Sequence, residues 1–397
     1  MRITRVIFGI VITISLYFTQ LTIIATNQFI FKNEITSFCY SLPLIIMLLI
    51  VISLFCSFRI SESLYCQIYI IMGLYMGYLL YSFQSSLLLR LLNLFFSLSI
   101  SINVLILYLI PLVICIYGVI NALVTRVEYI NIKYPGFKGK LRILLLSDIH
   151  LGAIHQKNSI IRIVNETKQL KPDIVVITGD MADGSLRVKH EWLKPFDDLT
   201  IPILFVTGNH EELNPKNDMI KVVNMTKIKY IGRHDIFKYK GVNFIGEDFG
   251  YNLRKSLLGV KQEEGIPNIL LSHIPVLKPD ELSKYNIFLF LAGHTHGGQL
   301  FPLQVVAYIA NACFSGLYTD KNKKNFVYVS EGVNNALVPM RVGSKRMYDV
   351  EFELMASAVY GLGINLFFNK EQQHNEQIVG NSSWLARQKD YITDLKE

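Results

Sequence analysis

The chain has 397 residues, of which 51% are apolar and 18% charged, and its formal net charge is +8. The charged residues are distributed unevenly, because only five of the 39 Lys and Arg and two of the 31 Asp and Glu lie in residues 1–125. This distribution excludes a single soluble domain, a disordered chain and a small disulfide-linked scaffold. It predicts a membrane region at 1–125, followed by a soluble region large enough to bury its own core.

Four segments of the apolar region are long enough to cross a bilayer as helices, since a span needs about 20 mostly apolar residues. They are Val6–Ala25, Phe38–Phe58, Leu64–Phe83 and Ile102–Val124, the last of which contains a proline. The stretch Leu87–Ser101 is apolar but contains an Arg and an Asn. We interpret it as an interfacial segment or an extension of a neighbouring helix, with a fifth span as the alternative.

Basic residues in the short loops predict the orientation of these segments. With four spans and the amino terminus inside, most flanking Lys and Arg lie on the inner side, as the positive-inside rule requires. The protein is then a multi-pass protein of the inner cell membrane with a cytoplasmic soluble domain. The apolar cores of the four segments contain no Asp, Glu, Lys, Arg or His, the residues that mark ion and proton pathways. An anchor is therefore favoured over a transporter.

The rest of the sequence predicts a connector at 126–141, a folded domain at 142–355 and a tail at 356–397. In the first half of the domain, short apolar runs alternate with a segment of helical spacing at Lys157–Leu170, which is typical of an α/β domain. The second half is richer in strands and predicts a second sheet packed on the first. The expected strands are Arg142–Leu146, Asp173–Thr178, Ile203–Thr207, Phe237–Lys240, Val242–Gly246, Asn268–Ser272, Phe288–Ala292, Phe326–Ser330 and Met347–Leu354.

Five short polar motifs directly follow five of these strands. In open α/β sheets, sites form beyond the carboxyl ends of the strands, so loops held by a rigid sheet bring distant motifs together. The motifs contain five of the nine His of the chain, which argues against a purely structural role for all of them. Their polar members are Asp148, His150, Asp180, Asn209, His210, Glu211, His273, His294 and His296.

These side chains have the composition of a metal site. Carboxylates, an amide and imidazoles suit first-row divalent metals better than calcium, which prefers oxygen ligands, and they contain no thiolate. Two Asp, one Asn and four His give seven ligands, which is more than one catalytic metal with an open position needs. Seven ligands are enough for two metals if one carboxylate binds both. Two metals roughly 3.5–4 Å apart clamp a phosphoryl oxygen and generate a hydroxide nucleophile at neutral pH. The donors accept two ions of Mn, Fe or Zn, and also Co or Ni.

The five motifs, in this order, resemble the calcineurin-like metallophosphoesterase superfamily, whose pattern is DxH…GD…GNH[DE]…H…GHxH. The resemblance covers residues 142–355 and implies a four-layer α/β/β/α sandwich. It also implies that His210 contacts the phosphate and protonates the leaving oxygen, and that Glu211 orients this histidine. In this pattern Asp180 is the bridging carboxylate. The implied ligands of the first metal are Asp148, His150 and His296, and those of the second are Asn209, His273 and His294.

The motif at Gly293–Gln299, followed by Pro302, resembles a subgroup of membrane-linked bacterial enzymes. Some members of this wider group hydrolyse UDP-2,3-diacylglucosamine during lipid A synthesis. The apolar stretch Leu300–Tyr318 is interpreted either as a lipid-facing rim beside the metals or as core packing under the loop. The segment Val329–Gly343 matches the PxRxG-like part of the subgroup pattern but not its glycine-rich turn, which leaves the substrate open.

We therefore predict a membrane-anchored dinuclear phosphoesterase that hydrolyses a phosphoester or pyrophosphate bond of a lipid-linked substrate such as UDP-2,3-diacylglucosamine. One alternative is a phosphodiesterase for soluble substrates. Another is a membrane sensor or scaffold that binds a partner or phosphoryl ligand without turnover. The expected partners are a phosphorylated small molecule or lipid and the membrane. No periodic pattern of Lys or Arg with aromatic residues indicates nucleic acid, and the sequence does not fix the oligomeric state.

Overall fold

The computed structural model describes residues 17–30, 61–134, 137, 139–212, 216–259 and 265–356. The expected span Phe38–Phe58 lies outside the described residues, as does the tail after residue 356. Of the expected span Val6–Ala25, the part from residue 17 onward is described and lies in a helix that continues to residue 30.

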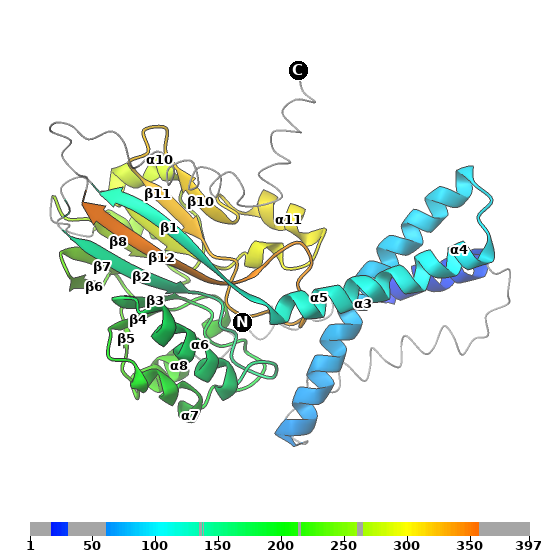
Figure 1. The fold of residues 1–397 in the computed structure, drawn as a ribbon, viewed down its shortest axis with the longest axis horizontal. Helices are drawn as coiled ribbons and strands as arrows, with labels where there is room; N and C mark the ends of the chain where they lie inside the picture. Colours follow the sequence, from blue (N-terminus) through cyan, green and yellow to red (C-terminus); the bar gives the residue numbers. More distant parts are fainter. Residues whose placement is uncertain are drawn as a thin grey trace. The chain divides into compact units, whose positions relative to one another are not determined.

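The chain divides into two compact units, which are described separately (Figure 1). The first contains Met1–Val124 together with the short segment Ala336–Val342. The second contains Thr125–Asn335 and Gly343–Glu397. The first unit therefore includes seven residues that lie more than two hundred positions after its helices in the sequence.

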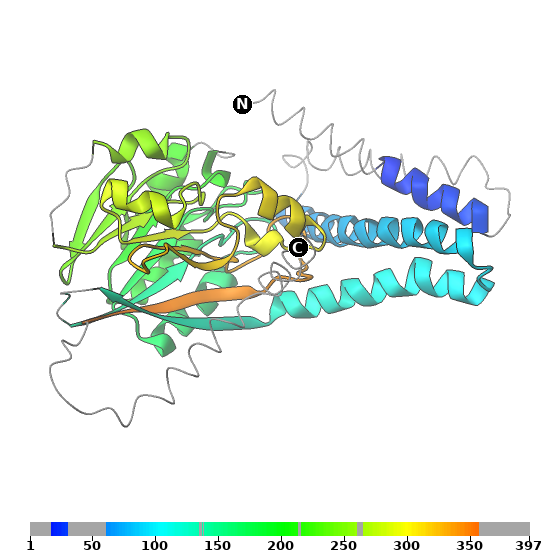
Figure 2. The same cartoon turned by 90° about the horizontal axis from the view of Figure 1, so that it is seen from above.

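Two helices of the first unit are long and apolar enough to cross a membrane. The first is α3 (Glu62–Phe95), and it is capped by Ser61, whose hydroxyl accepts a hydrogen bond from the amide of Leu64. The chain then reverses into a second helix, as Figure 2 shows. This second helix consists of α4 (Ile100–Val104), the π-helical turn η1 (Leu105–Leu109) and α5 (Ile110–Leu123).

The sequence-based spans agree with these two helices. Leu64–Phe83 lies within α3, and Ile102–Val124 coincides with the second helix except for its last residue. Most of the stretch Leu87–Ser101 extends α3, which was one of the three interpretations of this stretch. The π-helical turn comes just before Pro111, which has no amide donor and crowds the preceding turn.

The segment Ala336–Val342 is hydrogen-bonded to α5. The amide of Arg341 donates to the carbonyl oxygen of Gly118 at 2.9 Å. The side-chain amide of Asn121 donates to the carbonyl oxygen of Arg341 at 3.0 Å. Because Asn121 is buried and lies one helical turn after Gly118, both bonds form on one face of the helix.

The second unit contains two six-stranded sheets. The first has the strand order β1-β12-β2-β3-β4-β5, in which β2 to β5 are parallel, β12 is antiparallel to β2, and β1 is parallel to β12. Strands β2, β3 and β4 are almost continuous apolar runs because both faces of this sheet are covered. The bounds are β1 Thr125–Tyr134, β2 Lys140–Leu146, β3 Ile174–Thr178, β4 Ile203–Val206, β5 Ile228–Tyr230 and β12 Arg346–Ala356.

The second sheet has the strand order β10-β11-β9-β8-β7-β6. Its four inner strands are parallel, and the outer strands β6 and β10 are antiparallel to their neighbours. The bounds are β6 Ile236–Tyr239, β7 Val242–Gly246, β8 Asn268–Leu271, β9 Leu289–Ala292, β10 Gly316–Thr319 and β11 Phe326–Val329.

Three apolar clusters hold this unit together. One contains residues of both sheets, among them Ile143 and Val176 of the first and Phe244 and Leu291 of the second. Another joins the first sheet to α6, α7 and α8, and the third joins the second sheet to α9 and α10 (Figure 1). The bounds of these helices are α6 Lys157–Leu170, α7 His190–Leu193, α8 Lys216–Val223, α9 Leu253–Leu257 and α10 Pro279–Leu282.

Every strand expected from the sequence is present within two residues at each end, and the expected helix Lys157–Leu170 is α6. The main difference concerns the expected connector at 126–141, because most of it forms β1, an edge strand paired with β12 (Figure 2). Its burial alternates at Ile130 and Ile132, a period-two signal that covers too few residues to stand out in the sequence. Strands β5 and β10 were not expected either.

The pairing register determines which strand ends lie on the same side of the first sheet, and we call such a side an edge. The carboxyl ends of β2, β3 and β4 lie at one edge because these strands are parallel. Strand β1 runs in the opposite direction to β2, since it is parallel to β12 and β12 is antiparallel to β2. Thr125 pairs with Arg346, and Asp349 pairs with Leu145. The first residue of β1 therefore lies at the edge where β2 ends.

Candidate metal centre

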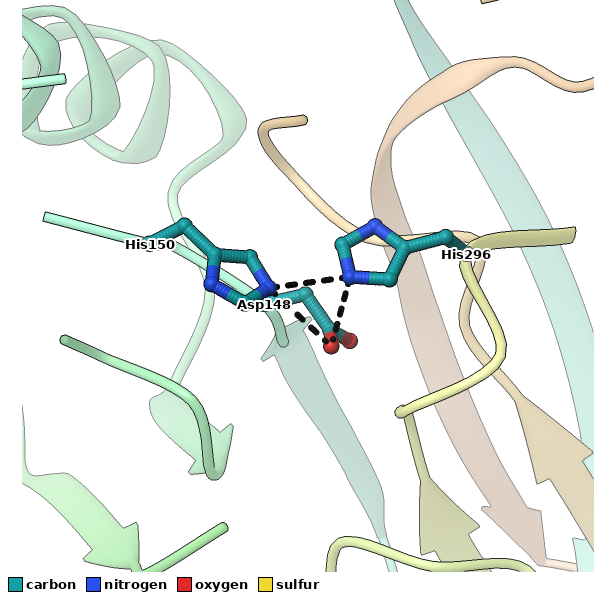
Figure 3. A group of neighbouring side chains, drawn as sticks. All are labelled: Asp148, His150 and His296. Atoms are coloured by element: carbon teal, nitrogen blue, oxygen red, sulfur yellow. Dashed lines mark hydrogen bonds and ion pairs between the residues drawn. The ribbon is translucent and has the colours of Figure 1, made fainter. Parts of the chain in front are cut away.

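Asp148, His150 and His296 form the first group of converging side chains (Figure 3). The Nε2 atoms of the two histidines are 2.9 Å apart. Oδ1 of Asp148 lies 3.2 Å from Nε2 of His296 and 3.8 Å from Nε2 of His150. Asp148 and His150 follow β2, whereas His296 belongs to the short helix η5 (His296–Gly298) after β9. The two sheets thus contribute to one group.

Asp180, directly after β3, lies between this group and the next. Its Oδ2 atom is 3.2 Å from Nε2 of His273, 3.8 Å from Nε2 of His150 and 3.9 Å from Nε2 of His210. Its other oxygen, Oδ1, accepts a hydrogen bond from the amide of His210 at 2.8 Å. One carboxylate oxygen thus faces histidines of both groups, which is the arrangement that a bridging ligand requires.

Asn209, His273 and His294 form the second group. Oδ1 of Asn209 lies 3.0 Å from Nε2 of His273 and 2.8 Å from Nδ1 of His294. On the other side of its ring, Nδ1 of His273 is 2.9 Å from the carbonyl oxygen of Thr178. Because a carbonyl only accepts, Nδ1 carries a proton, and in the neutral ring the lone pair of Nε2 points at Asp180 and Asn209.

The resemblance implies that Glu211 orients His210, and the structure gives the contacts of each. Nδ1 of His210 lies 2.8 Å from the carbonyl oxygen of Asp183. The fully buried carboxylate of Glu211 instead accepts hydrogen bonds from the amides of Asp180 at 3.0 Å, Ala182 at 3.0 Å and Gly208 at 2.6 Å. Glu211 thus joins the loops after β3 and β4. It influences the position of His210 through the backbone of these loops.

The backbone around the site is held in unusual conformations. Asp148, His150, Asp180, His294 and His296 all have positive φ, a region that non-glycine residues rarely adopt and that clusters at functional sites.

Two glycines in the same loops leave room for the ligands. A Cβ atom at Gly208 would lie 2.2 Å from Oδ1 of Asp180, and one at Gly293 would lie 2.5 Å from Oδ2 of Asp148. Both positions therefore require glycine for steric reasons.

The donors fit a bound cation. Oδ1 of Asp148 is buried without a hydrogen-bond partner, and burying an unpartnered carboxylate oxygen is costly. The two Nε2 atoms that flank it approach each other closely, as nitrogen lone pairs do when they share an ion. Together the clustered Asp and His residues are suited to divalent metal binding.

The electrostatics agree with this conclusion. Burial alone would raise the pKa values of Asp148 and Asp180, but the facing histidines lower both well below the usual range, so both side chains stay anionic. Burial would lower the pKa of His273, but the carboxylate of Asp180 raises it to about 9. Burial lowers the pKa of His150. The pKa of Glu211 is raised to about 7, mainly by burial and to a smaller extent by the negative charge of Asp180.

Comparison with known proteins now identifies the domain. A family model described as calcineurin-like phosphoesterase matches residues 141–298. An uncharacterized metallophosphoesterase of Aquifex aeolicus is 30% identical over 219 residues, which cover 51% of this chain and 81% of that protein. The chain belongs to the calcineurin-like phosphoesterase family. This membership supports a metal-dependent phosphoesterase, as the motifs predicted.

Two longer relatives of the same family are described as transmembrane proteins with a metallophosphoesterase domain. The one from Bos taurus is 34% identical over 59% of this chain, and the one from Danio rerio is 31% identical over 60%. The chain spans 58% and 59% of the lengths of these two relatives. Their names and the two apolar helices of the first unit suggest that this chain is associated with a membrane.

Sequence reasoning missed several residues that hold the ligands in place. The Ser147 hydroxyl donates to Oδ2 of Asp148 at 2.6 Å. The amide of Asn334 donates to the carbonyl oxygen of Asp148 at 3.2 Å, and its side chain donates to that of Ile149 at 2.6 Å. Asn334 lies beyond the residues that the family model matches and outside the five motifs, so no sequence pattern signalled its role.

Proposed function

We propose that the protein is a membrane-anchored dinuclear phosphoesterase. The observation that carries this proposal is the convergence of Asp180 and six other Asp, Asn and His side chains that follow strands of both sheets. In this proposal Asp148, His150 and His296 would hold the first ion, Asn209, His273 and His294 would hold the second, and Asp180 would be a ligand to both. When bound, the two ions supply Lewis-acid activation of water and of the phosphoryl group.

His210 is proposed as the catalytic residue that contacts the substrate. Its side chain is 26% exposed, whereas those of His150, His273 and Asp148 are fully buried. The carbonyl of Asp183 orients the ring, so Nε2 faces the centre of the site and is free to contact a phosphoryl oxygen and to protonate the leaving oxygen. Glu211 is proposed as a positioning residue, because its carboxylate fixes the loop backbone on which His210 lies.

The proposed substrate is a lipid-linked phosphoester or pyrophosphate, of which UDP-2,3-diacylglucosamine is the example to test. Support comes from the apolar helices in the same chain and from exposed apolar side chains shortly after the last ligand, among them Val306 and Ile309. A phosphodiesterase acting on soluble substrates would have the same metal centre. We further propose that the anchor has four spans and that the catalytic domain is cytoplasmic.

The domain is also proposed to be the four-layer α/β/β/α sandwich of its family. Support comes from the three apolar clusters, because one lies between the sheets and each of the others joins a sheet to helices.

The test is hydrolysis by the detergent-purified full-length protein after metal removal and restoration with Mn²⁺. The substrates are bis-p-nitrophenyl phosphate and UDP-2,3-diacylglucosamine, and Asp180→Ala is the inactive control. Metal-dependent cleavage of the lipid nucleotide far above that of the model ester supports the whole proposal. Cleavage of the model ester alone keeps the phosphoesterase and rejects this substrate. Bound metal without cleavage of either would favour a sensor or scaffold.

A further inference from the structure

Helix α11 (Leu303–Ala310) belongs to the second unit (Figure 1). Its polar and apolar side chains are distributed in the opposite way to those of an ordinary surface helix. Its buried side chain is the polar Gln304, which is 2% exposed. Its apolar side chains point outward instead, with Val306 64% and Ile309 77% exposed. A surface helix ordinarily buries its apolar stripe and exposes its polar one. We therefore expect an apolar surface to cover the outer face of α11 in the functioning protein.

The sequence around α11 indicates which surface this is. Residues 297–319 contain no Asp, Glu, Lys or Arg, so α11 and the segments on both sides of it bring no charge to this surface. Besides Val306 and Ile309, α11 exposes Leu303 and Tyr308, and Phe301 just before the helix is exposed as well. Large aliphatic residues with Phe and Tyr are typical of helices that lie in the interface of a bilayer.

Helix α11 begins close to the ends of β2, β3 and β9 that lead into the proposed ligands Asp148, Asp180 and His296. We call this side of the domain the metal edge. The helix begins shortly after η5, which contains His296, and Leu300 pairs with Gly343 just before the helix. The first residue of β1, Thr125, lies at this same edge of the first sheet. Only Val124 separates β1 from Leu123, the last residue of a helix long and apolar enough to cross a membrane. The chain thus enters the domain at the metal edge, with no linker.

We propose that α11 lies in the interface of the lipid bilayer and turns the metal edge towards the membrane surface. The phosphoester that reaches the metals then belongs to a molecule held at the depth of the lipid headgroups. This inference deepens the proposed function and rests on it for the substrate, whereas the membrane contact of α11 is independent of catalysis.

The first experiment measures the contact itself in the full-length protein, reconstituted into phosphatidylcholine nanodiscs. Ile309→Trp places a fluorophore on α11. Met225→Trp places one on an exposed position just before β5, at the opposite edge of the first sheet. Acyl chains brominated near the headgroup quench only tryptophans that reach the bilayer. We expect the added fluorescence of Ile309→Trp to fall by about half or more and that of Met225→Trp to stay unchanged.

Equal fluorescence of the two variants with and without bromine overturns the proposal. The proposal is also overturned if the quenching of Ile309→Trp by bromine changes with the number of chains per disc. A second copy of the chain, and not the bilayer, would then cover α11. Either outcome leaves the phosphoesterase activity untouched, so failure of this inference is distinguishable from failure of the proposed function.

The second experiment measures catalysis with the double variant Val306→Glu and Ile309→Glu, and with Met225→Glu as its matched control. We expect an unchanged rate on bis-p-nitrophenyl phosphate and a KM about tenfold higher for the lipid nucleotide in phosphatidylcholine vesicles, because two carboxylates disfavour the interface. An unchanged KM for the lipid nucleotide contradicts a role of α11 in substrate access. Loss of both activities indicates misfolding, and the quenching result then decides.

Discussion

The Nε2 atoms of His150 and His296 lie 2.9 Å apart, although 146 positions separate the two residues in the chain. His150 follows a strand of the first sheet and His296 a strand of the second. Their distance is therefore set by the apolar cluster between the sheets and not by any local motif. A change in that cluster would alter the stability of the domain and the geometry of the metal site together.

Phe244→Ala tests this dependence. Phe244 is fully buried in the cluster shared by the sheets, and removing its ring leaves a cavity. We expect the free energy of unfolding to fall by about 3–5 kcal/mol, together with weaker metal binding. Denaturant titration followed by tryptophan fluorescence, with metal content measured in parallel, gives both values. Leu258→Ala, at an exposed position of the same unit, should change neither. A Phe244→Ala protein with normal stability and normal metal content would contradict the view that the cluster between the sheets sets the geometry of the site.

His210→Gln separates proton donation from metal binding. The side chain of His210 is proposed to protonate the leaving oxygen and is not among the proposed ligands. We expect unchanged metal content and a kcat about 10²- to 10³-fold lower for an ester with a poor leaving group. Bis-p-nitrophenyl phosphate should be affected less, because p-nitrophenolate leaves without a proton. Equal losses for both esters would exclude the role as an acid, and loss of metal would make His210 a ligand.

Metal binding should release protons near neutral pH. The Asp180 carboxylate outweighs burial and holds the pKa of His273 at about 9, so this imidazole is protonated at pH 7.5. A metal requires the Nε2 lone pair, so binding expels the proton and the affinity rises with pH until about 9. Calorimetric titration of the metal-free protein with Mn²⁺, in two buffers of different ionisation enthalpy, measures the number released. Identical heats in both buffers would show that His273 is already neutral.

Gly73→Ala and Gly77→Ala form a matched pair on α3. A Cβ at Gly73 would lie 2.6 Å from the carbonyl oxygen of Leu337, a backbone atom that cannot move alone. At Gly77 it would meet the terminal methyl of Met340, a flexible group that can swing away. Because alanine favours helix by up to about 1 kcal/mol over glycine, we expect Gly77→Ala to be neutral or stabilising. Gly73→Ala should destabilise by about 1–3 kcal/mol.

Thermal unfolding of the two glycine variants, with limited proteolysis to report on the segment Ala336–Val342, gives the comparison. Faster cleavage within this segment is expected only for Gly73→Ala. Identical behaviour of the two variants would show that the segment does not depend on close approach to α3.

The sequence was sufficient for the parts of this protein that depend on local pattern. Buried parallel strands are unbroken apolar runs, so β2, β3 and β4 could be predicted, and the polar motifs after them marked Asp and His residues that the structure brings together. The burial alternation of β1 covers few residues and follows a membrane-type helix, which is why its pairing with β12 was missed. The contact of His210 with the carbonyl of Asp183, and the three amides that converge on Glu211, arise only after the loops have folded against one another.

The inclusion of Ala336–Val342 in the helical unit has a practical consequence for anyone who wishes to study catalysis in isolation. A chain cut at Thr125 would keep these seven residues but lose Gly118 and Asn121, which bond to them. The residues just before the segment, Asn334 in particular, support the loop of Asp148. Obtaining a soluble enzyme would therefore require a redesigned surface for this segment as well as a new amino terminus.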